Sequence, residues 1–324
     1  MRLKRLREYL PLCGAIYGKL RKLREDRRKL IRYLHEMVRE RDELYRQLDE
    51  LTRRLQISQD AALLYNAQSE ATRLRFIEFL RLIRPLDIDD KSKIRVGGPH
   101  DGGYVMIDDF EQVTTPLSIG IGHEISWDKD MNRRGLYIFQ FDHTLEAPPV
   151  LQPRFRFFKK KVGPVSKVNS EITLADILEL EELRDDRNLI MKMDIEGDEW
   201  AVLDATSEYS IRRLRQFVIE FHDMHKFASP EWGDRALRVF TKITHTHQVI
   251  HVHGNNHNGF AVLGGIPFPA VAELTLVRKD HHTFSIPHRC WPTELDAPNQ
   301  PTLADLSMGT FEFVETVCTR LIDD

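Results

Sequence analysis

Two apolar runs in the second half of the chain, LIMKM (189–193) and FVIEF (217–221), constrain its fold most strongly. Neither run alternates polar and apolar residues as a strand with one solvated face does, so we expect both to be buried on two faces, as in a parallel sheet. Similar runs recur with helical stretches between some of them, including 170–186, which Ser170 or Thr173 would cap. The alternation predicts a Rossmann-like, doubly wound and mostly parallel α/β domain over residues 87–324. Its expected strands are TPLSIGIG (115–122), LYIFQFD (136–142), NLIMKMDI (188–195), QFVIEFH (216–222), HQVIHVHG (247–254) and AELTLV (272–277).

A seven-residue apolar repeat precedes this domain, beginning at Leu20 and reaching Tyr65. Apolar a and d positions sustained over about six heptads predict an α-helical coiled coil, and hence a homo-oligomer through residues 20–65. The alternative is a single amphipathic helix packed on its own domain. Arginine at two a positions weakens the seam and fixes its register. The a positions hold Leu20, Arg27, Leu34, Arg41, Leu48, Leu55 and Ala62, and the d positions hold Leu23, Leu30, Met37, Leu44, Leu51, Ser58 and Tyr65.

The predicted organisation therefore has three parts. Residues 1–66 form a basic N-terminal segment with the coiled coil, and residues 67–86 form a connecting helix. In that helix the apolar residues have helical spacing until Pro85 ends the pattern. The α/β domain occupies residues 87–324. The spaced apolar residues of the connecting helix are Leu74, Ile77, Leu80 and Ile83.

Charge is distributed unevenly along the chain. Residues 1–60 hold 17 Lys+Arg and 10 Asp+Glu, whereas the rest of the chain holds 30 and 40. The first ten residues, MRLKRLREYL, interleave basic and leucine side chains before Pro11 and Gly14 break the pattern. Such a segment suits a membrane surface or a partner enzyme, and a solvated helix start explains it equally well. Nucleic acid is not expected as a partner, because the body is acidic.

Neither a membrane span nor a signal peptide is visible in the sequence. No apolar run approaches the roughly 18–20 residues that cross a bilayer, and the N-terminus lacks an apolar h-region with a cleavage site. The cysteines Cys13, Cys290 and Cys318 are too scattered for a disulfide framework or a zinc site. We expect a cytoplasmic protein, and its basic start leaves peripheral attachment at the inner membrane face open.

Glycines after the first strand indicate a cofactor site. Gly120 and Gly122 follow that strand directly, and Asp142 ends the next strand 20 residues beyond Gly122. An acid at this distance is placed to hold ribose hydroxyls. A third glycine is missing from the motif, which favours adenosine without a pyrophosphate, and hence S-adenosylmethionine. The predicted cofactor-binding residues are Asp101, Gly102, Gly103, Tyr104, Gly120, Gly122, Glu124, Ser126 and Asp142. A hairpin turn explains the pair Asp101-Gly102 just as well.

Acidic residues also end the two buried runs. Asp194 ends one strand, and Glu220 and His222 end the next. If these strands are neighbours, their ends lie about 5 Å apart. The three side chains would then bind a divalent cation such as Mg²⁺ or Mn²⁺, or provide a base that deprotonates an alcohol. Glu196 and Glu199 are also explained by the start of a helix alone.

A histidine-rich stretch, HQVIHVHGNNHNG (247–259), contains a further candidate site. His251 and His253 lie at i,i+2 and share one face of a strand. We predict that His253 is an alternative catalytic base and that Asn255 and Asn256 contact the substrate. Simple hydrogen bonding of the histidines is the competing interpretation.

The motifs DGGYVM, SIGIGHEISWD, FQFDHT, MKMDIEGDEW, VIEFH, HVHGNN, ELTLV and LDAPN occur in an order that resembles the FkbM-like methyltransferases. The resemblance covers residues 95–299, and Lys192-x-Asp194-x-Glu196-Gly197 is its most specific part. It implies a Rossmann-like fold and S-adenosylmethionine-dependent O-methyl transfer, often onto sugar hydroxyls. It further implies that Gly120, Gly122 and Asp142 bind the cofactor and that Asp194 and Glu196 border the reacting centre.

From these features we predict an O-methyltransferase that acts on a glycan or polysaccharide hydroxyl and is oligomerised by its coiled coil. Asp194, Glu196 and His253 are its predicted catalytic residues, and Asp194, Glu220 and His222 its predicted metal ligands. The alternative is a non-catalytic coiled-coil scaffold whose body is a relic of a cofactor-binding domain.

Overall fold

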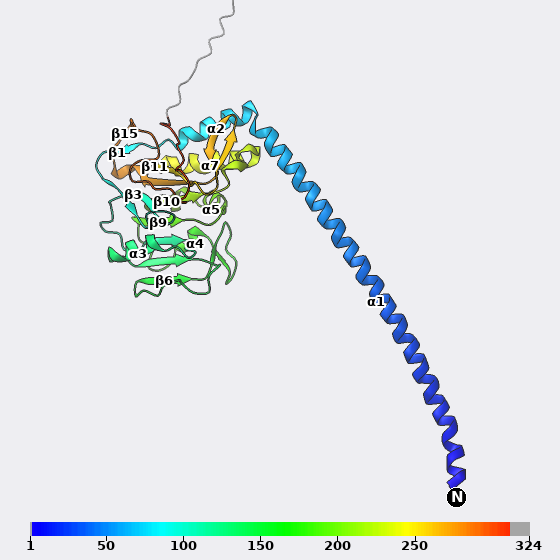
Figure 1. Cartoon of the computed structure of the whole chain (residues 1–324). Coiled ribbons are helices and arrows are strands. Elements are labelled where there is room, and N and C mark those ends of the chain that lie inside the picture. Colours follow the sequence, from blue (N-terminus) through cyan, green and yellow to red (C-terminus); the bar gives the residue numbers. More distant parts are fainter. Residues whose placement is uncertain (1, 312–324) are drawn as a thin grey trace, which may run out of the picture. The chain divides into compact units, whose positions relative to one another are not determined.

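The computed structural model describes residues 2–311, and of residues 2–17 and 57–61 the backbone alone. The chain divides into two units, residues 1–62 and the residues from 63 onward. The first unit belongs to α1 (Arg2–Ala67), a helix of 66 residues (Figure 1).

The helix predicted over residues 20–65 is confirmed by α1. The break predicted at Pro11 and Gly14 is wrong, because α1 runs through both residues. A proline removes one helical hydrogen bond, and strong helix formers on either side carry the helix past it. The side chains of the basic segment 1–10 lie outside the described residues. Self-association of α1 stays a prediction.

The second unit is an α/β body built on a seven-stranded sheet (Figure 1). All six predicted strands form, and the sheet has one more, β6 (Phe155–Phe158). The short sequence FRFF carries an arginine and stands among loops, so its pattern did not identify it. The predicted strands are β4 (Leu117–Ile119), β5 (Ile138–Phe141), β9 (Leu189–Met193), β10 (Leu214–Phe221), β11 (His247–Gly254) and β14 (Ala272–Arg278).

The strand order is β11-β14-β10-β9-β4-β5-β6. Strands β10, β9, β4, β5 and β6 are parallel, and β14 is antiparallel to both of its neighbours. From the centre of the sheet the chain first builds outward through β4, β5 and β6, and then in the other direction through β9 and β10. This is a doubly wound order, and it reverses between β4 and β9. Ligands of such sheets bind beyond the carboxyl ends of the strands at that reversal.

Helices and hairpins pack on both faces of the sheet. Neighbouring residues of one strand point to opposite faces. Met191 and Ile219 belong to a large apolar cluster with the helices α2 (Glu70–Leu82), α5 (Glu199–Ala205) and α7 (Pro230–Thr246). Ile190 and Val218 belong to a second cluster with Trp127 of α3 (Ser126–Arg133) and the strands β2 (Lys93–Val96) and β3 (Tyr104–Ile107). Burial on both faces explains why the central strands have continuous apolar sequences.

The remaining elements of the body are shorter. The helices are α2 (Glu70–Leu82), α3 (Ser126–Arg133), α4 (Leu174–Leu178), α5 (Glu199–Ala205), α6 (Glu208–Ile211) and α7 (Pro230–Thr246), with the 3₁₀ turns η1 (Met224–Ala228) and η2 (Lys279–His281). Four two-stranded sheets pair β1 (Asp87–Ile88) with β15 (Phe284–Ser285), β2 (Lys93–Val96) with β3 (Tyr104–Ile107), β7 (Lys161–Val162) with β8 (Glu171–Ile172), and β12 (Phe260–Leu263) with β13 (Ile266–Pro269). The helix predicted at 170–186 is only the five residues of α4, capped by Thr173.

The helix predicted to connect the two parts, α2, belongs to the core of the body. Ser69 caps its N-terminus, and Phe76 and Phe79 are buried against α7, η1 and the sheet. Phe79 packs edge-on to Phe240 with ring centroids 5.2 Å apart. Leu74, by contrast, is exposed. Leu80 and Ile83 of the same predicted spacing are buried, so the aliphatic spacing was right at these two residues and wrong at Leu74, where the aromatic side chains define the buried face.

Among the described residues, no helix combines the length and the apolar character that crossing a membrane requires.

Truncating α2 on its buried face should destabilise the body. We expect Phe79→Ala to lower the free energy of unfolding by about 3–5 kcal/mol, because it leaves a cavity in the aromatic cluster. The control Leu74→Ala should change it by less than about 0.5 kcal/mol. Tryptophan fluorescence during denaturant unfolding reports the body alone, since all four tryptophans lie in it. Equal effects of the two substitutions would contradict the observed helix face.

Candidate active site

At the carboxyl ends of β4 and β9 the two backbones lie so close together that no side chain fits between them. The amide of Asp194 donates to the carbonyl of Ile119 at 2.9 Å. Gly120 follows with a φ of +74°, and a Cβ atom there would lie 1.6 Å from the carbonyl oxygen of Asp194. Lys192 donates to the Gly120 carbonyl at 2.6 Å. Only glycine fits this position, on grounds of both space and conformation.

Asp142, at the end of β5, holds the loop that follows Gly120. Its Oδ2 accepts from the amides of Ile121 and Gly122 at 3.1 and 3.0 Å. Its Oδ1 accepts from the amide and the hydroxyl of Thr144 at 2.7 and 2.6 Å. Burial disfavours the charged carboxylate, but these bonds outweigh burial and lower the pKa of Asp142. Four donors occupy the carboxylate, so a ribose hydroxyl would have to replace one of them.

A cavity of about 480 Å³ opens beside this loop, and we call it the glycine-loop cavity. It lies at the carboxyl ends of β4, β5 and β9, where the strand order reverses. Lysines and histidines share its wall with acidic residues, among them Lys160, Lys161, His123 and His143. The predicted cofactor residues that line it are Asp101, Gly102, Gly120, Gly122, Glu124 and Asp142.

Three predicted cofactor residues lie behind the wall of this cavity. The hydroxyl of Ser126 accepts from the amide of Gly98 at 2.6 Å and donates to the Gly102 carbonyl at 3.1 Å. Gly103 is packed so tightly that a Cβ would lie 1.9 Å from the Gly98 carbonyl oxygen. Tyr104 is 1% exposed, and its hydroxyl has no hydrogen-bond partner among residues 2–311. The first two residues therefore shape the loop at 97–103.

A second cavity, of about 500 Å³, adjoins the first, and we call it the acidic cavity. Asp101, Asp194 and Glu196 line both cavities. The lining of the acidic cavity is entirely polar or charged, and consists of Asp101, Asp194, Glu196, Glu220, His222, Asn255, His257, Asn258, Asn299 and Gln300. The structure thus brings together Asp194, Glu196, Glu220, His222 and Asn255 as predicted, because β9 and β10 are parallel neighbours.

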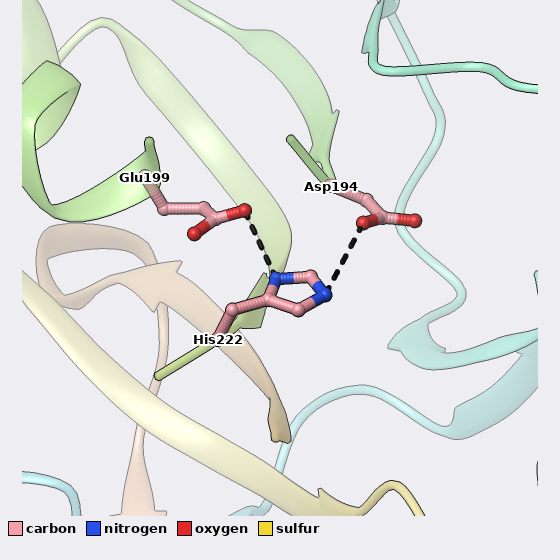
Figure 2. Close-up of side chains that lie close together, drawn as sticks. All are labelled: Asp194, Glu199 and His222. Carbon is pink, nitrogen blue, oxygen red and sulfur yellow. Dashed lines mark hydrogen bonds and ion pairs between the residues drawn. The ribbon is translucent and has the colours of Figure 1, made fainter. Parts of the chain in front are cut away.

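His222 is held by a residue that the sequence analysis assigned only to a helix start. Its Nδ1 lies 3.1 Å from Oε1 of Glu199, which is fully buried at the beginning of α5 (Figure 2). The carboxylate of Glu199 also accepts from the amides of Ile195 and Gly197 at 2.8 and 3.1 Å. Nε2 of His222 faces Asp194 and Glu196, with distances of 4.0 and 3.5 Å to the nearest oxygens. Glu199 therefore orients the ring and leaves Nε2 toward the cavity.

The titration behaviour of these groups follows from their crowding. Burial opposes the charged form of His222, but the hydrogen bond to Glu199 and the charges of Glu199, Glu220 and Asp194 prevail and raise its pKa to about 9. Burial raises the pKa of Asp194, and neighbouring acids add to the effect. Burial, and then the charges of Asp194 and Glu273, raise the pKa of Glu220 well above its ordinary value. The cluster has more negative charge than His222 and Lys192 balance.

Asp194, Glu199 and His222 offer ligand atoms that lie within 4.8 Å of one another. The predicted metal set named Glu220 in place of Glu199. Glu220 lines the acidic cavity, but its Oε1 accepts from Asn255 at 2.6 Å. Glu199 is occupied by two amides and Nδ1, which suits the support of a ligand better than direct ligation. The sequence does contain a signal for Glu199. It is an acid at the start of a helix, five residues after the strand-end acid Asp194, and the next strand is followed by His222.

Two residues at the rim of this site have backbone conformations that are rare for residues other than glycine. Glu196 has a φ of +56° and Asp223 a φ of +64°. Between them lies Gly197, where a Cβ would come within 2.8 Å of Oδ2 of Asp223. Such conformations cost free energy and cluster at functional sites. They turn the chain away from the sheet directly after Asp194 and His222.

Two further predicted functional residues, His253 and Asn256, line neither cavity. His253 is 1% exposed, and its ring lies between Glu273 and Asp305, at 3.1 Å from each. Burial opposes its charge, but these carboxylates raise its pKa to about 10. Asn256 donates to the carbonyls of Gln300, Leu303 and Ala304. Both residues fasten the segment 291–306, which contributes Asn299 and Gln300 to the acidic cavity. His253 thus does not line the site where a catalytic base was predicted, and carboxylates hold both of its ring nitrogens.

No protein-family model matches this sequence, and none of the curated proteins compared with it matches either. Among solved structures, the crystal structure of spermidine synthase from Thermotoga maritima is similar at a TM-score of 0.30 and 12% identity, over 60% of this chain and 72% of that chain. A score this low carries no argument, so the fold stands on the strand order described above.

The contact between Glu199 and His222 predicts a titration that can be measured. Glu199→Gln should lower the pKa of His222 from about 9 toward its ordinary value of 6.5 or below, since the negative charge is removed while burial stays. The pKa is followed by nuclear magnetic resonance of the imidazole protons. The control Glu208→Gln, which alters the exposed pair with His245, should leave the pKa of His222 unchanged. An unchanged value in Glu199→Gln would contradict the pairing.

The same pairing predicts how stability depends on pH. The pKa of His222 is higher in the folded than in the unfolded state, so its stabilising contribution is complete below about pH 6.5 and is lost as pH rises through 9. We therefore expect the free energy of unfolding to fall between pH 7 and 9.5, and to fall less steeply in Glu199→Gln.

Proposed function

We propose that this protein is an S-adenosylmethionine-dependent O-methyltransferase that acts on a carbohydrate hydroxyl. One observation carries the proposal: a cavity at the reversal point of a doubly wound sheet adjoins a wholly polar cavity, and Asp101, Asp194 and Glu196 line both. A methyl donor in the first cavity and an acceptor in the second would meet at Asp194. The ordered motifs that resemble FkbM-like methyltransferases support the same reaction.

The residues of the glycine-loop cavity suit a nucleoside cofactor. Gly122 has a φ of +49° and nothing within 4 Å of where its Cβ would be, so the loop presents bare backbone to a ligand. Lys160 and Lys161 supply positive charge for a carboxylate, and Asp101 and Glu124 supply negative charge for an ammonium group. An amino-acid moiety joined to a nucleoside needs both, which favours S-adenosylmethionine over a dinucleotide.

The acidic cavity suits a ligand with many hydroxyl groups. It has no apolar lining residue among those described, so it lacks a surface for an aromatic or aliphatic acceptor. Asn299 is buried, and its Oδ1 has no hydrogen-bond partner in the part of the chain that the structure describes. Its amide nitrogen donates to Glu273 at 2.6 Å, so the buried oxygen is the acceptor of this side chain that stays unsatisfied. These features favour a sugar as the acceptor.

The position of Asp194 supports a mechanism for the proposed reaction. The acceptor oxygen attacks the methyl carbon of the sulfonium, the carbon–sulfur bond breaks, and its electron pair remains on sulfur to give S-adenosylhomocysteine. The hydroxyl proton passes to a carboxylate of the acidic cavity, and Asp194, between donor and acceptor, is positioned to take it. His222 has a pKa of about 9 and is protonated at neutral pH, so it does not serve as the base.

A divalent cation fits the same residues. Asp194 offers an oxygen ligand, and His222 offers Nε2 while Glu199 holds Nδ1, the arrangement in which proteins support a metal-bound histidine. A bound Mg²⁺ or Mn²⁺ would lower the pKa of the acceptor hydroxyl. The crowding that raises the pKa of Asp194 and Glu220 also favours a cation there.

Cofactor binding is tested by calorimetry with S-adenosylhomocysteine. Gly122→Ala should weaken binding at least tenfold, because the new methyl group projects from the loop that faces the cofactor. Gly135→Ala is a matched control, since Gly135 also has a positive φ and open space around its Cβ position but does not line the cavity. Absence of binding to the unsubstituted protein would overturn the proposal and leave the scaffold interpretation.

Metal binding is tested by titrating Mn²⁺ and following its free paramagnetic resonance signal. We expect one site per chain, weakened at least tenfold by Asp194→Asn and by His222→Ala. His225→Ala is the control, because His225 is an exposed neighbour in η1. If the protein leaves all the Mn²⁺ free, the cation is excluded and a carboxylate alone serves as the base.

A further inference from the structure

The helix α1 exposes an apolar seam along most of its length. Nine apolar residues at a and d positions are each between 49% and 65% exposed. All nine lie within residues 1–62, which form a unit of their own. Helices in proteins gain most of their stability from packing an apolar face. The nine residues are Leu20, Leu23, Leu30, Leu34, Met37, Leu44, Leu48, Leu51 and Leu55.

The seam is widest in the middle of the helix. Ile31, Val38 and Tyr45 occupy consecutive e positions and are 40%, 44% and 60% exposed. Together with the a and d residues they form an apolar stripe that is broader than a coiled-coil seam made of a and d positions only. A partner must therefore follow the same heptad period over several turns, and a second copy of α1 does so by construction.

Charges beside the seam favour one orientation of that second copy. The two arginines at a positions each follow an acid at a g position, as Asp26-Arg27 and Glu40-Arg41. In a parallel, in-register coiled coil an a side chain packs into a hole that includes the preceding g residue of the partner helix. Arg27 would thus lie beside Asp26 of the other chain, and Arg41 beside Glu40 of the other chain. These two contacts are two heptads apart along the helix. In an antiparallel pair the g residues of the two chains face each other instead.

We infer that α1 binds a second copy of this chain through residues 20–55, in parallel and in register. The leucine seam supplies the contact area, and the two acid–arginine pairs select the register. In the single chain Arg41 pairs with Asp42 at 2.7 Å, but both side chains are more than half exposed, and surface pairs of this kind exchange partners at little cost.

Light scattering of the full chain after size exclusion gives the first test. We expect a mass of at least twice 38.0 kDa, and a shift toward one chain mass in the double variant Leu30→Glu/Leu44→Glu. A single chain mass for the unsubstituted protein at high concentration overturns the inference. If the double variant keeps a mass of two or more chains, the inference is also overturned, because another surface would then be the interface.

Single cysteines test the orientation in the full chain. Cys13, Cys290 and Cys318 are first replaced by serine, since Cys13 itself falls at an a position of the repeat. Leu23→Cys and Leu51→Cys should each form a disulfide-linked dimer on mild oxidation, because equal positions meet in a parallel register. In an antiparallel pair the two copies of either residue lie about 40 Å apart, and neither variant would crosslink. The control Arg32→Cys, at an outward f position, should stay uncrosslinked.

Charge reversal tests the register. Glu40→Arg should lower the scattering mass at a fixed concentration near the midpoint of dissociation, since it places arginine against arginine. The exchanged variant Glu40→Arg/Arg41→Glu should restore the mass. The control Glu36→Lys makes the same kind of charge change at a c position and should leave the mass unchanged. Failure of the exchange to restore assembly contradicts the proposed pairing.

Discussion

The contact between Gly120 and Asp194 is the constraint on which the site depends. The backbone of the first strand end comes so close to the second that any side chain at Gly120 would overlap the carbonyl of Asp194. This closeness joins the glycine-loop cavity to the acidic cavity, because Asp194 lines both. Lys192 of the second strand also donates to the Gly120 carbonyl. This hydrogen bond holds the glycine loop and the lysine charge at the end of the strand.

The second determinant is a local excess of buried acid. Asp194 and Glu220 end neighbouring parallel strands, and Glu199 enters from the helix that follows. Burial makes their charges costly unless a counter-charge is present. His222 supplies part of that charge, which is why its pKa is high. Protonation of one acid, a divalent cation or a polar acceptor would each reduce the cost of the negative charge that His222 does not balance. The excess of buried acid therefore favours binding of a ligand at this site.

The histidine-rich stretch has a structural part in the molecule. His251 lies 2.7 Å from Asp296, and His253 lies between Glu273 and Asp305. These pairs hold the segment 291–306 across the carboxyl end of the sheet, where Asn299 and Gln300 wall the acidic cavity. Their influence on chemistry would therefore act through the shape of that wall.

The sequence alone determined the helix of residues 20–65, the six predicted strands and the convergence of Asp194 with His222, because heptad spacing, doubly buried runs and strand adjacency are local or nearest-neighbour properties. It missed β6, whose four residues carry too little pattern, and it assigned the exposed Leu74 to the buried face of α2.

Only the tertiary structure decided the role of Glu199, which is an ordinary helix-start acid until the fold buries it against His222. The tertiary structure also placed His253 away from the cavities, since its partners Glu273 and Asp305 lie 20 and 52 residues away in the chain. Side-chain partners at such separations are set by how the elements pack, and no periodicity in the sequence records them.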